Sequence, residues 1–151
     1  MTTTRSITAI ASLAAILGLT AGVAEAKCPP GLGKRHPLQV VADLRAALAA
    51  QDWEAVACNY LRTAFLIDDQ GFHIGPEEIV ASYVSYHDLF GGAQPLITEE
   101  EAYERVVRTL YQLDGGWVVI EDGVDTYHIA NGRIRFQTRH GLLTFTGPPP
   151  Q

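Results

Sequence analysis

Hydrophobic positions recur every three or four residues in three parts of the chain, which is the spacing of one buried helix face. The first part covers residues 38–50. The second follows Asp52, a residue type that favours the N-cap of a helix, and continues to Leu61. The third begins at Pro76, because proline suits the first helical turn, and ends before Gly91. The pattern predicts three helices, of which the first two form an antiparallel pair.

Alternating apolar and polar positions, bounded by turn-forming residues, predict strands in the rest of the chain. We expect a short strand at 64–68, a return segment at 72–75, a loop or sheet edge at 93–101, a strand at 103–113 and a last strand at 142–145. Helices that precede a run of strands are typical of the α+β class. The predicted architecture is therefore three helices packed on one face of a curved antiparallel sheet.

Residues 117–141 have the strongest strand pattern and predict a β-hairpin around Asn131 and Gly132, which suit a turn whose central residues need a positive φ. Ala130 is expected opposite Arg133. The period of two then assigns these side chains to the inner face: Asp125, Tyr127, Ile129, Ile134, Phe136, Thr138 and His140. It assigns these to the outer face: Val124, Thr126, His128, Arg133, Arg135, Gln137 and Arg139. Ionisable groups on an otherwise buried face are either paired or functional.

Composition and charge narrow the possible functions. Of 151 residues, 47% are hydrophobic and 19% are charged, which is the composition of one ordinary globular domain. The formal net charge is −6 and the longest basic run is Lys34-Arg35, so we expect no nucleic-acid partner. The three arginines on the outer face of the hairpin are interpreted as solvated charge.

The first 26 residues have the features of a secretory signal peptide. Arg5 precedes an apolar stretch at 7–20, and Ala24-Glu25-Ala26 is a small-x-small cleavage site. Cleavage near Ala26 would deliver a secreted or periplasmic protein without a stable membrane anchor. We divide the chain into a signal peptide at 1–26, an irregular arm at 27–37, a folded domain at 38–146 and a proline-rich tail at 147–151.

The chain contains two cysteines, Cys28 and Cys58. In an oxidising compartment such a pair favours a disulfide, which would tie the arm to the helices. The alternative is two free thiols, with Cys58 buried on its helix as a small apolar residue. The histidines are not spaced like metal ligands, so we expect neither a metal nor a cofactor.

Three stretches occur in order along the chain: AAQDWEAVACNY, AFLIDDQGFHIGPEEIVASY and GVDTYHIANGRI. Their order and spacing resemble the nuclear transport factor 2-like superfamily, which includes SnoaL-like proteins and ketosteroid isomerases. The resemblance covers Leu38 to about Phe145 and implies a cone-shaped α+β domain, often dimeric through its sheet. It places Asp68 at the general base of the isomerases and Asp125 near their second, protonated aspartate. Leu44 stands where the isomerases have an oxyanion-hole tyrosine, so steroid isomerisation itself is not expected.

The candidate catalytic residues are Asp68, Asp125 and His140. A carboxyl group inside an apolar cone has its charged form disfavoured, so its pKa rises and it can transfer protons near neutral pH. In the expected register His140 is diagonal to Asp125, and such a pair orients an imidazole as a base. The alternatives are structural, with Asp68 as a turn cap and Asp125 bonded to Thr138 or His140. The candidate ligand-binding residues are Tyr60, Tyr83, Tyr127 and Phe136.

These patterns leave two classes of function. In the first, the cone binds a small apolar or aromatic molecule, with or without cofactor-free acid–base chemistry of the isomerase or dehydratase type. In the second, the domain is a non-catalytic interaction module. Its open sheet face would then pair with a second copy or another protein through Thr126, His128, Arg135 and Arg139.

Overall fold

The computed structural model describes residues 28–148, so the predicted signal peptide at 1–26 and the end of the proline-rich tail lie outside the described residues. Within residues 28–148 three α-helices and a short 3-10 helix form: η1 (Leu32–Lys34), α1 (Pro37–Ala49), α2 (Trp53–Cys58) and α3 (Gly75–Leu89). Seven strands complete this part: β1 (Tyr60–Asp68), β2 (Gly71–Ile74), β3 (Leu96–Tyr103), β4 (Val106–Asp114), β5 (Val118–Ala130), β6 (Arg133–His140) and β7 (Leu143–Phe145). None of the helices in 28–148 is long and apolar enough to cross a membrane.

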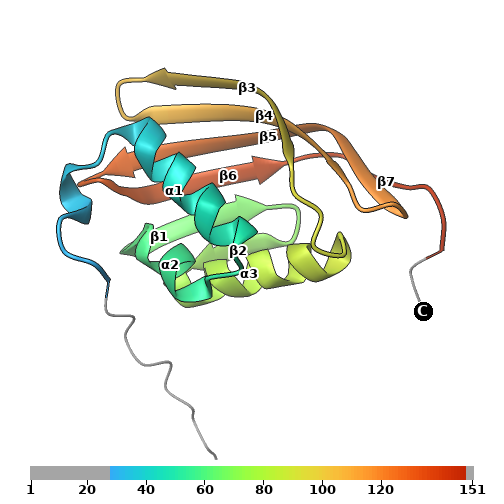
Figure 1. Cartoon of the computed structure of the whole chain (residues 1–151), viewed down its shortest axis with the longest axis horizontal. Helices are drawn as coiled ribbons and strands as arrows, with labels where there is room; N and C mark the ends of the chain where they lie inside the picture. Colours follow the sequence, from blue (N-terminus) through green and yellow to red (C-terminus); the bar gives the residue numbers. More distant parts are fainter. Residues whose placement is uncertain (1–27, 149–151) are drawn as a thin grey trace, which may run out of the picture.

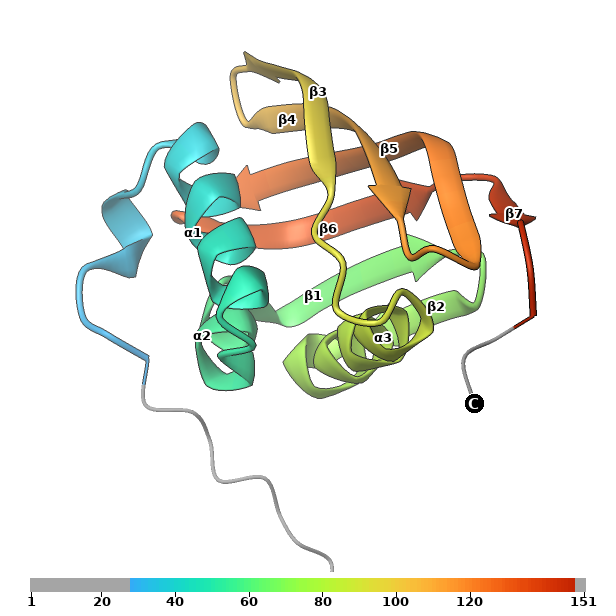
Figure 2. The same ribbon diagram turned by 45° about the vertical axis from the view of Figure 1, so that its right-hand side comes forward.

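The strands form one curved sheet in the order β2-β1-β6-β5-β4-β3, and β7 pairs with β5 beside this path. Every pairing in the described sheet is antiparallel except that of β1 with β6. The helices lie on one side of the sheet, with α1 against β4 to β6 and α3 against β1 and β2 (Figures 1 and 2). The predicted α+β class, with helices on one face of a mainly antiparallel sheet, is confirmed.

The second helix is shorter than the hydrophobic pattern predicts. It ends at Cys58, and Tyr60 and Leu61 belong to β1 instead. The parallel neighbour β6 explains the difference, because Tyr60 pairs with Ile134 and the Ile134 amide donates to the Asn59 carbonyl over 2.8 Å. Pairing with a strand far along the chain overrides the local helical pattern.

The strand predicted at 103–113 is in fact parts of two strands. β3 ends at Tyr103 and β4 begins at Val106, and in the turn between them Glu104 has a φ of 51°. A positive φ is uncommon for glutamate, and the Glu104-Arg105 turn contains none of the residues that usually mark a tight hairpin. The segment predicted as a loop or sheet edge is part of β3, which forms the outer edge of the sheet.

A β-bulge at Arg135 changes the register predicted for the last hairpin. Next to the turn, Ile129 pairs with Ile134 as expected. His128 then pairs with Phe136, so Arg135 is an extra residue in β6. Because side chains alternate along a strand, every residue of β6 beyond the bulge points to the opposite face from the predicted one.

The bulge exchanges the inner and outer residues of β6. Gln137 and Arg139, predicted on the outer face, are buried, with exposed fractions of 0% and 5%. Phe136, Thr138 and His140, predicted on the inner face, lie on the open face of the sheet, and His140 is exposed. Arg139 therefore does not join Arg133 and Arg135, the other two arginines predicted on the outer face of the hairpin.

The core lies between the helices and the inner face of the sheet, in two clusters. The larger joins α1 to β1, β5 and β6 through residues such as Val41, Leu44 and Leu66. The smaller joins the end of α3 to β4 and β5 through Phe90 and Ile120. Leu44 is fully buried, so the position that carries a phenol in the resembled isomerases is a core position in this chain.

The N-terminal arm is held at two points. A disulfide joins Cys28 to Cys58 at the end of α2, with Cα atoms 5.4 Å apart, which confirms the predicted pairing. Arg35 donates to the Gly132 carbonyl at 2.8 and 3.1 Å and to the Asp43 carboxylate at 2.8 Å. The arm therefore ties the turn of the β5–β6 hairpin to α1 and α2.

Breaking the disulfide is expected to destabilise the domain. The two cysteines are 30 residues apart, and the chain-entropy model assigns such a bridge ~3–4 kcal/mol. Urea unfolding of the wild-type protein should show a lower midpoint when reductant is present. Cys28→Ser should have the lower midpoint under both conditions, because its change lies in the arm and leaves the core intact. A wild-type midpoint that does not move on reduction would contradict this role.

Candidate functional site

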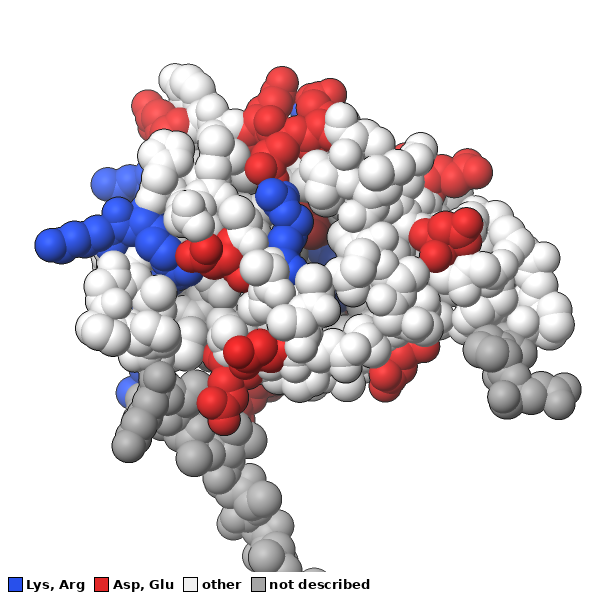
Figure 3. All heavy atoms as spheres, in the orientation of Figure 1, with Lys and Arg blue, Asp and Glu red and all other residues white. Residues whose placement is uncertain are grey.

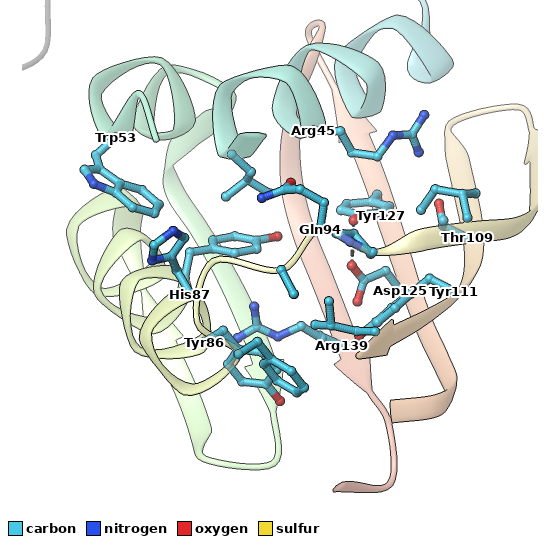
Figure 4. Close-up of a pocket in the computed structure, with 17 residues that line it drawn as sticks. Arg45, Trp53, Tyr86, His87, Gln94, Thr109, Tyr111, Asp125, Tyr127 and Arg139 are labelled. Atoms are coloured by element: carbon cyan, nitrogen blue, oxygen red, sulfur yellow. Dashed lines mark hydrogen bonds between the residues drawn. The ribbon is translucent and has the colours of Figure 1, made fainter. Parts of the chain in front are cut away.

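A cavity of about 100 Å³ lies between the helices and the inner face of the sheet, where the two core clusters meet. Aromatic side chains form much of its wall: Trp53, Tyr83, Tyr86, Phe90, Tyr111 and Tyr127. A buried carboxyl group and a buried guanidinium group, those of Asp125 and Arg139, also line it (Figure 4). No group of three His, Cys, Asp or Glu side chains that could hold a metal ion occurs within residues 28–148.

Asp125 reaches the cavity from the inner face of β5 and is 8% exposed. Its Oδ2 accepts a hydrogen bond of 2.7 Å from the Tyr127 hydroxyl and one of 3.4 Å from the Gln137 amide. Its Oδ1 has no partner among residues 28–148. Burial raises the pKa of Asp125 to about 6, although the nearby Arg139 and the Tyr127 hydroxyl act in the opposite direction. This carboxyl group can therefore gain or lose a proton near neutral pH.

Arg139 reaches the same cavity from β6, and its guanidinium lies over the Tyr86 ring, 3.7 Å from the centroid. Its Nη2 donates to Asp68 Oδ2 at 2.6 Å and also to the Ser82 hydroxyl. Burial disfavours the charge, but Tyr83 and other neighbours outweigh burial and raise the pKa of Arg139. Its Nε is buried and has no hydrogen-bond partner in the described part of the chain, so one N–H of the guanidinium is unsatisfied.

Asp68 lies behind Arg139, with a side chain that is 0% exposed. Its two oxygens make hydrogen bonds of 2.6–2.9 Å with Arg139, Ser82, the Gln70 amide and His73. Burial opposes ionisation, but the hydrogen bonds from His73, Arg139 and Ser82 outweigh it and lower the pKa of Asp68 to about 2. Asp68 is therefore an ionised partner for Arg139 at neutral pH.

Buried hydroxyl and amide groups support the Asp125 carboxylate from the core. The Gln137 amide donates to the Tyr83 hydroxyl at 2.9 Å, and the Tyr60 hydroxyl donates to the Gln137 carbonyl oxygen. The hydroxyls of Tyr60 and Tyr83 are 3.1 Å apart. Burial raises the pKa of Tyr60, Tyr83 and Tyr127, so these phenols stay protonated. The carboxylate is thus held on its Oδ2 side, whereas its Oδ1 is buried without a partner within residues 28–148.

The structure brings three of the predicted site residues to the cavity: Asp125, Tyr83 and Tyr127. Two others lie one layer behind the wall. The Tyr60 hydroxyl is bonded to that of Tyr83, and the Asp68 carboxylate is bonded to Arg139. The sequence pattern therefore finds the carboxyl group and two phenols of the cavity wall.

The remaining two predicted residues lie on the open face of the sheet. Phe136 packs against Phe65 with ring centroids 4.6 Å apart, and His140 is exposed beside Val124. The expected diagonal contact of Asp125 with His140 is wrong, because it assumes a hairpin without a bulge.

The sequence pattern assigns Arg139 and Gln137 to the outer face and therefore does not identify them as residues of this site. In the observed register Arg139 pairs directly with Asp125, whereas the unbulged register would place Thr138 there. An arginine opposite a buried aspartate compensates its charge, and a threonine does not. This difference is the signal in the sequence that would have favoured the bulged register.

Polar groups also surround the more exposed side of the cavity. Arg45 of α1 forms an ion pair with Glu100 of β3, on the face where acidic side chains gather over β3 (Figure 3). His87 of α3 lies edge-on to Trp53, with ring centroids 6.0 Å apart. Across residues 28–148, three buried side-chain atoms lack a hydrogen-bond partner: His87 Nε2, Asp125 Oδ1 and Arg139 Nε. All three belong to residues that line this cavity, which makes it the candidate site in the described part of the chain.

No protein-family model matches the sequence, and no curated protein matches it either. Solved structures do match. A candidate ketosteroid isomerase from Kribbella flavida has a TM-score of 0.62 at 16% identity, over 76% of this chain and 83% of that one. A candidate SnoaL-like polyketide cyclase from Shewanella denitrificans has a TM-score of 0.60 at 19% identity, over 70% of this chain and 90% of that one. A nuclear transport factor 2-like protein of unknown function from Cytophaga hutchinsonii has a TM-score of 0.58 at 14% identity, over 72% of this chain and 90% of that one.

The chain therefore has the nuclear transport factor 2-like fold that its sequence resembles. At identities of 14–19%, these likenesses establish the fold alone. One fold hosts many chemistries, so the function has to be argued from the cavity and its side chains.

Asp125→Asn is expected to stabilise the protein at neutral pH. With a pKa of about 6, folded Asp125 holds its proton more tightly than in the unfolded chain, so stability falls as the pH rises from about 4 to 7. The full effect is about 3 kcal/mol at neutral pH. Urea unfolding should show the variant more stable than the wild type at about pH 7.5, with a difference that shrinks to near zero at about pH 4.

Glu121→Gln is the matched control, because Glu121 is exposed on the same strand. It should leave the pH dependence of unfolding unchanged. An Asp125→Asn protein that is less stable than the wild type at neutral pH would show that the carboxylate is a structural group.

Proposed function

We propose that this chain is an exported domain that binds a small apolar or aromatic molecule in its cavity and transfers protons on it without a cofactor. The observation that carries the proposal is Asp125 Oδ1, a buried carboxyl oxygen at the cavity with no partner within residues 28–148. A carboxyl group with a pKa of about 6 serves as acid and as base near neutral pH. Isomerisation and dehydration are reaction types that require such a group.

In this mechanism ionised Asp125 removes a proton from a carbon next to a carbonyl group of the ligand. Negative charge develops on the carbonyl oxygen, and the Nε–H of Arg139 stabilises it from a guanidinium that Asp68 already holds in place. Protonated Asp125 then returns the proton to another carbon in an isomerisation, or to a leaving hydroxyl group in a dehydration. Arg139 replaces the oxyanion-hole tyrosine of the resembled isomerases, because Leu44 stands at the position of that tyrosine.

Three further properties support the proposal. Aromatic walls suit an apolar ligand, and a volume of about 100 Å³ limits its size. Structural neighbours are described as a candidate isomerase and a candidate cyclase. Export is supported by the signal-peptide pattern at 1–26 and by the disulfide, which is typical of oxidising compartments.

Isomerisation of cyclohex-3-enone, a one-ring ketone with an unconjugated double bond, tests this chemistry directly. Conjugation of the double bond increases the ultraviolet absorbance. The kcat/KM should rise as the pH increases through about 6, because the ionised form of Asp125 is the base. Asp125→Asn should lower kcat/KM by at least about 100-fold, whereas Glu121→Gln should not. Wild-type protein that leaves the ketone unchanged, or an Asp125→Asn variant with full activity, would refute the mechanism.

One observation favours the interaction module as a second candidate function. The register of the sheet aligns a mainly apolar row across its open face: Ile74, Phe65, Phe136, His128, Val106 and Tyr103. Ile74 is 66% exposed and Tyr103 is 78% exposed. Exposed apolar surface that runs across several strands favours association with a second copy through this face. Arg139, which the sequence pattern assigns to the same face, takes no part because it is buried.

Sedimentation velocity tests this association. If the row pairs with a second copy, the wild-type protein should be dimeric and the double variant Ile74→Lys, Tyr103→Lys should be monomeric. Leu142→Lys is the matched control, because Leu142 is 68% exposed but lies outside the row. A wild-type protein that stays monomeric at high concentration would exclude this function.

A further inference from the structure

Two buried polar atoms of opposite character belong to residues that line the cavity. Arg139 Nε is a donor, Asp125 Oδ1 is an acceptor when ionised, and neither has a partner within residues 28–148. We propose that the ligand of this cavity is a one-ring aromatic carboxylate, which binds together with one proton taken up by Asp125. This inference rests on the proposed function only in that the cavity is a small-molecule site. A carboxylate bound in this way occupies both Asp125 and Arg139, so it is a ligand that competes with the ketone and not the substrate of the proton transfer.

Arg139 supplies the positive charge that a carboxylate requires. Its Nη2 is bonded to Asp68 and Ser82, and the Tyr86 ring lies 3.7 Å from the guanidinium (Figure 4). These contacts hold the side chain in place at the cavity wall and leave Nε–H without a partner within residues 28–148. A carboxylate oxygen forms a charge-assisted hydrogen bond with this donor, which is stronger than the bond formed by a neutral carbonyl.

Asp125 explains why a proton accompanies the ligand. When one carboxylate oxygen accepts from Arg139 Nε, the second oxygen needs a donor, and ionised Asp125 can only accept. Protonated Asp125 donates through Oδ1–H and satisfies that oxygen. Arg139, Asp68 and ionised Asp125 carry one positive and two negative charges. Neutralising Asp125 while a carboxylate enters leaves this net charge unchanged, which avoids the penalty of an additional buried charge.

Titratable groups surround Asp125 on every element packed against it: Tyr127 on β5, Arg139 on β6, Tyr111 on β4, Asp68 and Tyr60 on β1, and Tyr83 on α3. Burial raises the pKa of the four tyrosines, and it opposes the shifts of both charged groups. The pKa of Asp68 is nevertheless about 2 and that of Arg139 is raised. None of these groups changes charge between about pH 5 and 7.5, which leaves Asp125 to take up the proton.

The more exposed side of the cavity adds two groups of its own. Arg45 is paired with Glu100, so the charges of these two residues offset each other. His87 lies across the cavity from Asp125 (Figure 4). A variant of Asp125 therefore has to identify the group that takes up the proton.

The cavity wall defines the body of the ligand. Trp53, Tyr86, Phe90 and Tyr111 offer aromatic faces and edges on several sides. The cavity is partly open, and its volume of about 100 Å³ is below the ~150 Å³ of an enclosed apolar cavity that binds benzene, so the body of the ligand is limited to one ring. A carboxylate at the Arg139 end of that ring matches the polarity of the site.

Isothermal titration calorimetry of the mature protein with benzoate tests this inference, with benzamide as the neutral counterpart. The Kd of benzoate should rise about 30-fold from about pH 5 to pH 7.5, because Asp125 must be protonated against a pKa of about 6. Titrations at neutral pH in buffers of different ionisation enthalpy should show uptake of about one proton per benzoate. Benzamide should bind without proton uptake, and more weakly than benzoate at the lower pH.

Variants assign the two partners of the carboxylate. At about pH 7.5 Asp125→Asn should bind benzoate at least about tenfold more tightly than the wild type and without proton uptake. Arg139→Gln should abolish benzoate binding, and Arg135→Gln, an exposed arginine of the same strand, is its matched control. Arg139→Lys covers the case in which Arg139→Gln fails to fold, and it should weaken benzoate but not benzamide.

The possible outcomes separate this inference from the proposed function. Equal affinity for benzoate and benzamide without proton uptake would overturn the carboxylate inference and leave the small-molecule site standing. Isomerisation of cyclohex-3-enone without benzoate binding would do the same. Proton uptake that persists in Asp125→Asn would assign the proton to another group and overturn the inference. If the protein neither binds nor turns over any of the probes, both proposals are overturned.

Discussion

The ion pair between Arg139 and Asp68 is the interaction on which the site depends. It joins β6 to β1 over 2.6 Å, and Ser82 of α3 bonds to both partners, so two strands and a helix meet at one buried charge. Removing either partner of such a pair leaves an unpaired charge in the interior, at a cost of roughly 3–5 kcal/mol. Asp68 and Ser82 both contact Nη2, whereas Nε of the same guanidinium is buried without a partner within residues 28–148.

The bulge at Arg135 makes this ion pair possible. Without the extra residue, Arg139 would point away from the core and Asp125 would lie opposite Thr138. A bulge interrupts the regular ladder of hydrogen bonds, but it re-aims every side chain that follows. The same insertion moves Phe136 to the open face, where it joins the apolar row. One local irregularity therefore shapes both the polar end of the cavity and the surface suited to association.

The cavity contains groups that work against stability. Asp125 is ionised at neutral pH only against the penalty of burial, and the unpaired Nε of Arg139 adds to the cost. The rest of the fold compensates through the hydrogen bonds to Asp125 Oδ2, the disulfide and the contacts of Arg35 with the hairpin turn. Unfavourable groups gathered in one cavity of an otherwise satisfied core are typical of a functional site.

The sequence by itself determined the α+β class, the three helices, the Asn131-Gly132 turn and the disulfide partners, because each depends on local periodicity, turn chemistry or residue count. It also indicated Asp125 as the unusual carboxyl group of the inner face. The tertiary structure alone decided that Arg139 and Gln137 face inward and that His140 does not. Those positions depend on the bulge in β6 and on its parallel pairing with β1, which bring together residues far apart in the chain. Local patterns do not describe such contacts, so only the assembled sheet shows that Asp68 holds Arg139 and that Arg139 lies opposite Asp125 at the cavity.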